Sequence, residues 1–184
     1  MKTRISFTLA GTALIAAAFA YGANSGLNKG EKVTPFHPSH FAGPLKNSTN
    51  CFPCTFQARP QVQVWVNGDN AGNVVAIAKS LSASMKKYDS KEFKALVVFV
   101  ADKKDVESVR STVLAATKGI DNVGMAVVAK NDESISNYKI NLSSEVKNTV
   151  FAYKDWTVQN KMVNLKADKA GLMDLDNAIA KLVK

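Results

Sequence analysis

The residues best suited to chemistry in this chain of 184 residues are its only two cysteines, Cys51 and Cys54. They belong to the motif Cys51-Phe52-Pro53-Cys54, in which two residues separate the thiols. A disulfide at this spacing closes a small ring, gains little from loop entropy and can be reducible. Lys46 and Arg59 are close in sequence and would favour a thiolate if they approach the pair. The motif therefore permits thiol–disulfide exchange, with one cysteine as nucleophile and the other as resolver, and the sequence does not say which attacks.

Two other interpretations of the pair remain open. The disulfide can simply pin a loop-rich segment of an exported protein whose domain binds a partner or performs no chemistry. The chain's only two histidines lie upstream in His37-Pro38-Ser39-His40, and both pairs have short chelating spacings. Two histidines and two thiolates can make a tetrahedral zinc site or a thiolate-rich copper site. The metal hypothesis uses His37, His40, Cys51 and Cys54, whereas the redox and structural hypotheses require no cofactor.

Residues 1–20 have the pattern of a secretory signal peptide. Lys2 and Arg4 give a positive start, an apolar run extends from residue 5 to residue 20, and Ala18-Phe19-Ala20 supplies the small residues that a signal peptidase reads. The run is at the short end for a bilayer of ~30 Å, which takes about 20 residues to span, and this favours a cleaved signal over an anchor. No later stretch could span a membrane. We expect cleavage before Tyr21 and export to the periplasm or the extracellular space.

The charge distribution argues against a nucleic-acid partner. The formal net charge is +9 at pH 7, and it falls by two to +7 once Lys2 and Arg4 are removed. The lysines are spread singly and in pairs with acidic residues between them, which is typical of a solvated surface. Hydrophobic content of 46% and charged content of 21% are ordinary for a folded protein, and the length suits one domain with a real core. We find no nucleic-acid motif, phosphate-binding loop or nucleophilic serine motif.

Residues 21–60 and residues 61–184 differ in pattern. The first segment is loop-like, with four prolines outside the cysteine motif and four glycines between residues 22 and 43, and we interpret it as an arm that carries the cysteines. In the second segment, periodicity predicts the following elements in order: a strand at 61–66, a helix at 71–87, a strand at 95–100, a helix capped by Asp102 with a buried stripe from 106 to 116, a strand at 123–128, a helical turn at 135–138, strands at 149–153 and 161–165, and a helix after Asp168.

This order of elements predicts the fold class. Strands that alternate with helices indicate right-handed crossovers and a parallel core, and the last two strands are close enough in sequence to form a hairpin. We therefore predict an α/β fold in which a mixed sheet, with a parallel core and a C-terminal antiparallel hairpin, is flanked by helices on both faces.

The same order resembles the thioredoxin-like fold, and in particular its redoxin and peroxiredoxin branch. Local resemblance lies in residues 30–36, which look like the entry segment of redoxins, in Val64-Trp65-Val66, in the stretch 129–140 that closes in Tyr138, and in residues 149–155. The resemblance implies a thiol–disulfide oxidoreductase acting through Cys51 and Cys54 on a protein partner. It equally allows a non-enzymatic binding module with a structural disulfide, because thioredoxin folds persist without catalytic cysteines.

The chain departs from that family at its usual catalytic positions. Thioredoxins carry the redox pair after the strand that corresponds to 61–66, where this chain has Asn67-Gly68-Asp69-Asn70-Ala71 and no sulfur. The position of the family's cis-proline corresponds to Asn148, and no proline follows Pro60. A helix running from Cys51 through residues 55–63 would restore the usual register, but Pro60 would interrupt it at a cost of about 3 kcal/mol. We therefore expect the CxxC to be displaced to a position before the first core strand.

Overall fold

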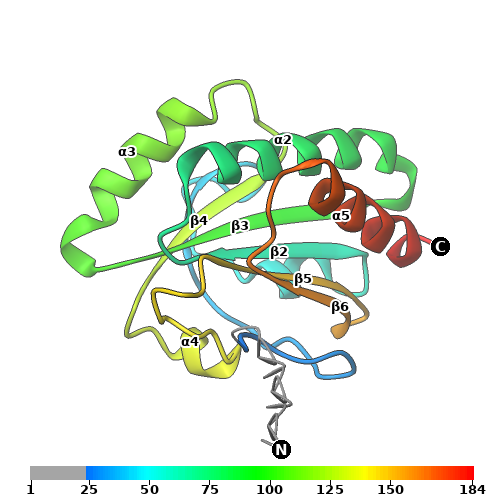
Figure 1. The fold of residues 1–184 in the computed structure, drawn as a ribbon, viewed down its shortest axis with the longest axis horizontal. Coiled ribbons are helices and arrows are strands. Elements are labelled where there is room, and N and C mark those ends of the chain that lie inside the picture. The colour runs from blue at the N-terminus through cyan, green and yellow to red at the C-terminus, as the bar shows by residue number, and fades with distance from the viewer. Residues whose placement is uncertain (1–23) are drawn as a thin grey trace, which may run out of the picture.

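A computed structural model describes residues 24–184, which form a six-stranded sheet in the order β1-β4-β3-β2-β5-β6 (Figure 1). The predicted signal peptide at residues 1–20 lies outside the described residues. The central strands β2, β3 and β4 are parallel, whereas β1, β5 and β6 each run antiparallel to the neighbour with which they pair. The predicted mixed sheet is therefore confirmed. Its strands are β1 Ser39–Ala42, β2 Gln61–Val66, β3 Lys94–Ala101, β4 Gly124–Ala129, β5 Asn148–Lys154 and β6 Thr157–Val163.

Helices cover both faces of the sheet, as the sequence predicts. Figure 1 shows the three longer helices above the sheet, and below it the short α4 and the arm. One hydrophobic cluster lies under α2, α3 and α5, and a second contains residues of the arm, α1 and α4. None of the helices described is long and apolar enough to cross a membrane. Their bounds are α1 Phe52–Phe56, α2 Ala71–Lys87, α3 Val106–Ala116, α4 Glu133–Asn137 and α5 Lys169–Leu182, with 3₁₀ turns at Asp89–Lys91 and Lys103–Asp105.

The central strand β2 is buried on both faces. Its valines face α2 and α5, while Trp65 faces the other cluster, and the strand's two glutamines are completely buried on that side. The alternation of polar and apolar residues in 61–66 predicted one better-buried face. The polar face is also covered, because the arm and α1 pack over it.

Two of the three longer helices carry side-chain caps at their N-termini. Asn70 Oδ1 accepts hydrogen bonds from Gly72 N at 2.8 Å and Asn73 N at 3.3 Å, so α2 begins at residue 71. Asp168 Oδ1 caps α5 by accepting from Gly171 N at 2.8 Å. The prediction for α3 is wrong at its start, because Asp102 precedes only a 3₁₀ turn and makes no capping bond there. The predicted stripe is correct in part, since Val106, Val109 and Val113 are half-buried and pack against the core, whereas Ala116 is exposed.

The second strand of the hairpin begins earlier than predicted, and the arm contains two short elements that were not predicted. The turn consists of Asp155 and Trp156, both with positive φ, so β6 begins at Thr157 and not at 161. In the arm, β1 pairs with β4, and α1 starts directly after Cys51. A strand of four residues and a helix of five are too short to show a period.

Candidate functional site

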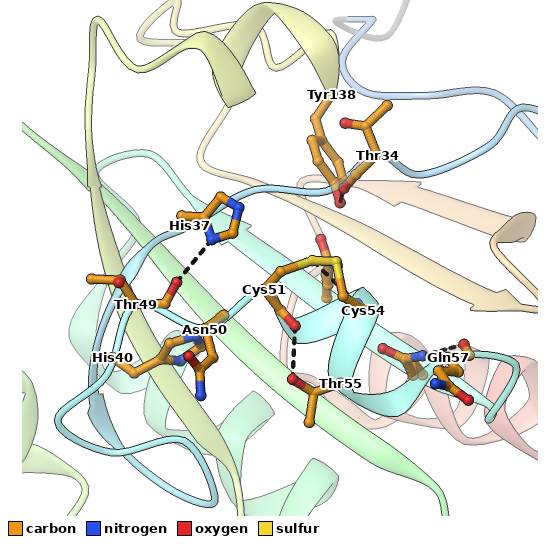
Figure 2. Close-up of a disulfide and its surroundings, with 12 residues drawn as sticks. Thr34, His37, His40, Thr49, Asn50, Cys51, Cys54, Thr55, Gln57 and Tyr138 are labelled. Atoms are coloured by element: carbon orange, nitrogen blue, oxygen red, sulfur yellow. Dashed lines mark hydrogen bonds between the residues drawn. A yellow bond between two sulfur atoms is a disulfide. The ribbon is translucent and has the colours of Figure 1, made fainter.

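The candidate site is the disulfide between Cys51 and Cys54 at the start of α1 (Figure 2). Cys51 is the N-cap residue, and its Sγ accepts a hydrogen bond from the backbone N–H of Cys54 at 3.1 Å. Thr55 donates both its N–H and its hydroxyl to the Cys51 carbonyl. Pro53 occupies the first turn, where its fixed φ suits a helix and its missing N–H leaves nothing unpaired. The motif therefore folds as a single helical turn closed by its own disulfide.

This helix is too short to restore the usual register. It ends at Phe56, and Gln57 follows with a φ of 49° while its N–H donates to Pro53 O at 2.7 Å. β2 then begins at Gln61. The predicted displacement of the CxxC to a position before the first core strand is confirmed.

The two cysteines differ in accessibility. Cys51 is only 5% exposed, whereas Cys54 is exposed, as is Thr55 beside it. The difference arises from Phe52, which is 1% exposed, packs its ring edge-on against Phe56 at 4.7 Å between centroids, and belongs to the hydrophobic cluster under the arm. Because Phe52 anchors the first turn to the sheet, Cys51 faces inward and Cys54 faces solvent.

A chain of buried hydrogen bonds connects this helix to the sheet. Trp65 Nε1 donates to Gln63 Oε1 at 3.1 Å, Gln63 Nε2 donates to the Tyr153 hydroxyl at 2.7 Å, and that hydroxyl donates to Gln61 Oε1 at 2.7 Å. Gln61 Nε2 then donates to Gln57 O at 2.9 Å, at the end of α1. Burial raises the pKa of Tyr153, so its hydroxyl keeps its proton. This network was not predicted, and the alternation of glutamines in β2 is its only signal in the sequence.

The two histidines hold the backbone just before the motif. His40 is buried, and its Nε2 lies 2.9 Å from Asn50 O, while His37 is exposed and its Nδ1 lies 3.1 Å from Thr49 O. Burial lowers the pKa of His40. The neutral ring therefore donates its Nε2–H to the Asn50 carbonyl, and its Nδ1 has no partner in the part of the chain that is described. Both imidazoles thus fix the entry to Cys51.

Neither cation that we considered as an activator is directed at the disulfide, and no metal site is assembled around it. Arg59 pairs with Glu92 at 3.0 Å, and Lys46 lines a surface hollow beside Gly43. Within residues 24–184 there is no group of three or more His, Cys, Asp or Glu side chains that could hold a metal ion. Because the two sulfurs are bonded to each other, the zinc or copper hypothesis concerns the reduced chain and stays a prediction.

The usual catalytic position, after β2, is occupied by a carboxylate and amides. Asp69 Oδ2 accepts from Asn73 Nδ2 at 2.7 Å and from Asn148 Nδ2 at 2.6 Å, and Asp69 Oδ1 accepts from Asn70 N at 2.7 Å. Asn148 also bonds the N–H and C=O of Leu165, at 2.8 and 3.0 Å. The peptide bonds of the described residues include no cis bond. A closed polar network therefore stands where the resemblance would place a dithiol and its cis-proline.

No family model matches this chain, and no curated protein matches its sequence. Solved structures do resemble it. One, assigned as the thiol:disulfide interchange protein DsbE from Chlorobium tepidum, has a TM-score of 0.64 and 16% identity over 86% of this chain and 99% of its own. Mycobacterium tuberculosis AhpC has a TM-score of 0.64 and 9% identity over 85% of this chain and 93% of its own. A thiol-disulfide oxidoreductase thioredoxin domain from Bacteroides vulgatus has a TM-score of 0.63 and 13% identity, covering 86% of this chain and 99% of that one. The chain has a thioredoxin-like fold, as predicted.

Proposed function

We propose that this thioredoxin-fold chain exchanges thiols and disulfides with a protein partner through Cys54 and Cys51, from a site placed before the first core strand. The observation that carries the proposal is the unequal exposure of the two cysteines, since Cys54 is exposed to solvent and Cys51 is buried. Solved structures of similar fold include proteins assigned as thiol:disulfide interchange proteins. The signal-like N-terminus supports action in an oxidising compartment, the periplasm or the cell exterior.

The exposure difference supports Cys54 as the cysteine that exchanges with the partner. A thiolate of the partner attacks Cys54 Sγ, the Cys51–Cys54 bond breaks, and the bonding electron pair passes to Cys51 Sγ as the leaving thiolate. A second thiolate of the partner then attacks the partner sulfur of the mixed disulfide and releases Cys54 as a thiolate. The partner has lost two electrons and gained a disulfide, and the chain has gained two electrons as a dithiol. In reverse, Cys54 attacks a partner disulfide and Cys51 resolves the intermediate.

The local geometry favours Cys51 as the leaving group. Its Sγ already accepts the Cys54 N–H, and this bond strengthens when the sulfur becomes an anion. A thiolate with a lower pKa leaves faster in thiol–disulfide exchange. Burial opposes this by disfavouring the charged form. The single N–H donor offsets part of that desolvation and provides the leaving thiolate with a fixed partner.

The reduction potential tests the proposal against a structural disulfide. The mature protein is equilibrated in graded redox buffers, and its free thiols are then labelled and counted. A potential between about −120 and −270 mV lies in the range of catalytic dithiols, whereas one below about −300 mV marks a structural disulfide and refutes exchange as the function.

Single cysteine variants test the direction of attack. With an aromatic disulfide reagent, Cys51→Ser presents the exposed Cys54 thiol and should react at least about tenfold faster than Cys54→Ser, whose remaining thiol is buried. Both variants should react at similar rates in urea, which shows that the difference comes from the fold. Faster reaction of Cys54→Ser in the native state would reverse the assignment.

The two alternative functions, a binding module with a structural disulfide and a metal-binding protein, predict different measurements. A non-enzymatic module with a structural disulfide is supported by the closed network of Asp69 and Asn148 at the usual catalytic position, and it predicts a reduction potential below about −300 mV. Zinc or copper binding predicts metal uptake by the reduced protein, lost when either His37 or His40 is replaced by alanine. Uptake that is indifferent to both histidines would remove the four-residue site.

A further inference from the structure

A pocket of about 270 Å³ lies between α2 and α3, at the ends of β2 and β3 opposite the disulfide. Its walls are mostly aliphatic and include Val66, Val74, Val100, Val109 and Val113, with Phe99 at the sheet. Small-molecule sites in proteins share this character of apolar walls with few polar groups, and this pocket is slightly smaller than their usual range of about 300–1,000 Å³. The pocket is separate from the cysteine pair, and a ligand bound there would not depend on thiol exchange.

The packing around the pocket is incomplete in a specific way. Val66, Val74, Phe99 and Val100 belong to the hydrophobic clusters yet keep 5–8% exposure, whereas Val97, on the same face of β3 as Phe99, keeps only 1%. On the other wall, α3 has valines that line the pocket but no buried residue. Core residues retain contact with solvent here because α3 stands over an open space, so an apolar guest would complete the packing.

The polar residues of the pocket determine which charge it accepts. Asp69, Ser108 and Thr112 line it with the apolar residues. A carboxylate has about four lone-pair sites. Asp69 uses two on Oδ2 for Asn73 and Asn148 and one on Oδ1 for Asn70 N, so one acceptor site on Oδ1 remains. All three donors are neutral, and no lysine or arginine pairs with Asp69 in the described part of the chain.

An anion is disfavoured at the same place. The N-terminus of α2 would ordinarily attract one through its free N–H groups. Here Asn70 Oδ1 already accepts from Gly72 N and Asn73 N, and Asp69 Oδ1 accepts from Asn70 N. An incoming carboxylate or phosphate would find these donors occupied and would face the charge of Asp69.

We propose that this pocket binds a small organic cation, a primary amine on a short apolar body. The ammonium group donates to the remaining lone pair of Asp69 Oδ1, and the apolar body lies between α2 and α3 against Phe99 and the valines. Charge complementarity selects the head group, and the unfilled apolar walls select the body.

The test compares three probes that share one alkyl chain. Hexylammonium, 1-hexanol and hexanoate are titrated separately into the oxidised protein at pH 7 and followed by the shifts of backbone amide resonances. We expect hexylammonium to bind about tenfold more tightly than hexanoate, with hexanol between them. Added salt should weaken hexylammonium binding and leave hexanol unchanged. Equal affinities for the three probes, or shifts that map away from α2 and α3, would overturn the proposal.

Two variants and a matched control locate the site. Asp69→Asn should lower the affinity for hexylammonium to that for hexanol and leave hexanol unaffected. Ala116→Phe should abolish binding of all three probes, because Ala116 lines the pocket, whereas the neighbouring Ala115→Phe on the same helix should bind normally. Equal effects of the two phenylalanine variants would contradict the location. The salt dependence of the unmodified protein decides the question even if a variant fails to fold.

Discussion

Removal of one buried hydroxyl, in Tyr153→Phe, should both destabilise the protein and loosen the helix that carries the disulfide. The Tyr153 hydroxyl accepts from Gln63 and donates to Gln61, and all three residues are completely buried. Phenylalanine keeps the ring and its packing, so the variant removes only the hydrogen-bonding atom. A donor on Gln63 and an acceptor on Gln61 are then left unpaired away from water.

The size of the effect is set by these two unpaired groups. A buried polar group that loses its partner costs about 1–3 kcal/mol, so we expect Tyr153→Phe to lower the free energy of unfolding by about 2–4 kcal/mol. For a domain of this size the melting temperature falls by about 2–4 °C per kcal/mol. Urea denaturation monitored by circular dichroism measures the free energy, and an unchanged m-value shows that the unfolded state is not altered.

Tyr138→Phe is the matched control. Tyr138 is also completely buried, and its hydroxyl donates its hydrogen bond to the backbone carbonyl of Thr34 at 2.7 Å. We expect a loss of about 1 kcal/mol. If Tyr153→Phe proves no more destabilising than Tyr138→Phe, the reasoning from two unpaired groups is refuted.

A second readout connects the network to α1. Gln61 Nε2 donates to the carbonyls of Gln57 and Arg59 at 2.9 and 3.4 Å. The Gln57 N–H in turn closes α1 by donating to Pro53 O. Hydrogen exchange at the Gln57 amide should therefore accelerate in Tyr153→Phe and stay unchanged in Tyr138→Phe.

Three further predictions concern the disulfide, a buried histidine and the network after β2. Replacing Cys51 and Cys54 together by alanine should cost about 2 kcal/mol in urea unfolding, because a ring of four residues gains little entropy; a loss above about 4 kcal/mol would favour the structural pin. Burial lowers the pKa of His40 below 6.5, so the unfolded chain binds a proton that the native chain does not. The free energy of unfolding should therefore fall as the pH drops from about 6.5 towards the pKa of His40 in the folded protein. The free energy of unfolding, measured with urea between pH 5 and 7, should depend less on pH in His40→Gln than in the unmodified protein. Asn148→Ala should cost about 2–3 kcal/mol, because it removes the bonds to Asp69 and Leu165; a loss below about 1 kcal/mol would mean that water replaces the amide.

The elements that sequence reasoning located correctly are those with a clear local pattern, either a repeated helical period or a continuous apolar run. Residues 71–87 place apolar side chains on one face over several turns and carry Asn70 as a cap, and the structure has α2 at Ala71–Lys87. The apolar run that predicted a strand at 95–100 is β3, which is buried on both faces. These patterns result from burial on a sheet, and the sequence records them directly.

The features of the candidate site result from tertiary contacts, and no local sequence pattern predicts them. The exposure of Cys54 and burial of Cys51 arise from Phe52, which packs on the sheet far from its own place in the sequence. The burial of Gln61 and Gln63 arises from coverage by the arm and α1. Alternating polar residues ordinarily indicate a solvated face, and only tertiary packing reverses that expectation.

The central strand β2 separates the disulfide from the hydrogen-bond network of Asp69. The disulfide precedes β2, and Asp69 follows it, so the six residues of the strand, about 20 Å at ~3.3 Å per residue, lie between them. A negative charge still stands next to the N-terminus of α2, but it belongs to a carboxylate that cannot transfer electrons. The disulfide has a separate hydrogen-bond donor, the backbone N–H of Cys54, which donates to Cys51 Sγ. Because sites this far apart without shared partners act independently, a failure of thiol exchange would not touch the proposal for the α2–α3 pocket, and an empty pocket would not weaken the assignment of Cys54 as the attacked sulfur.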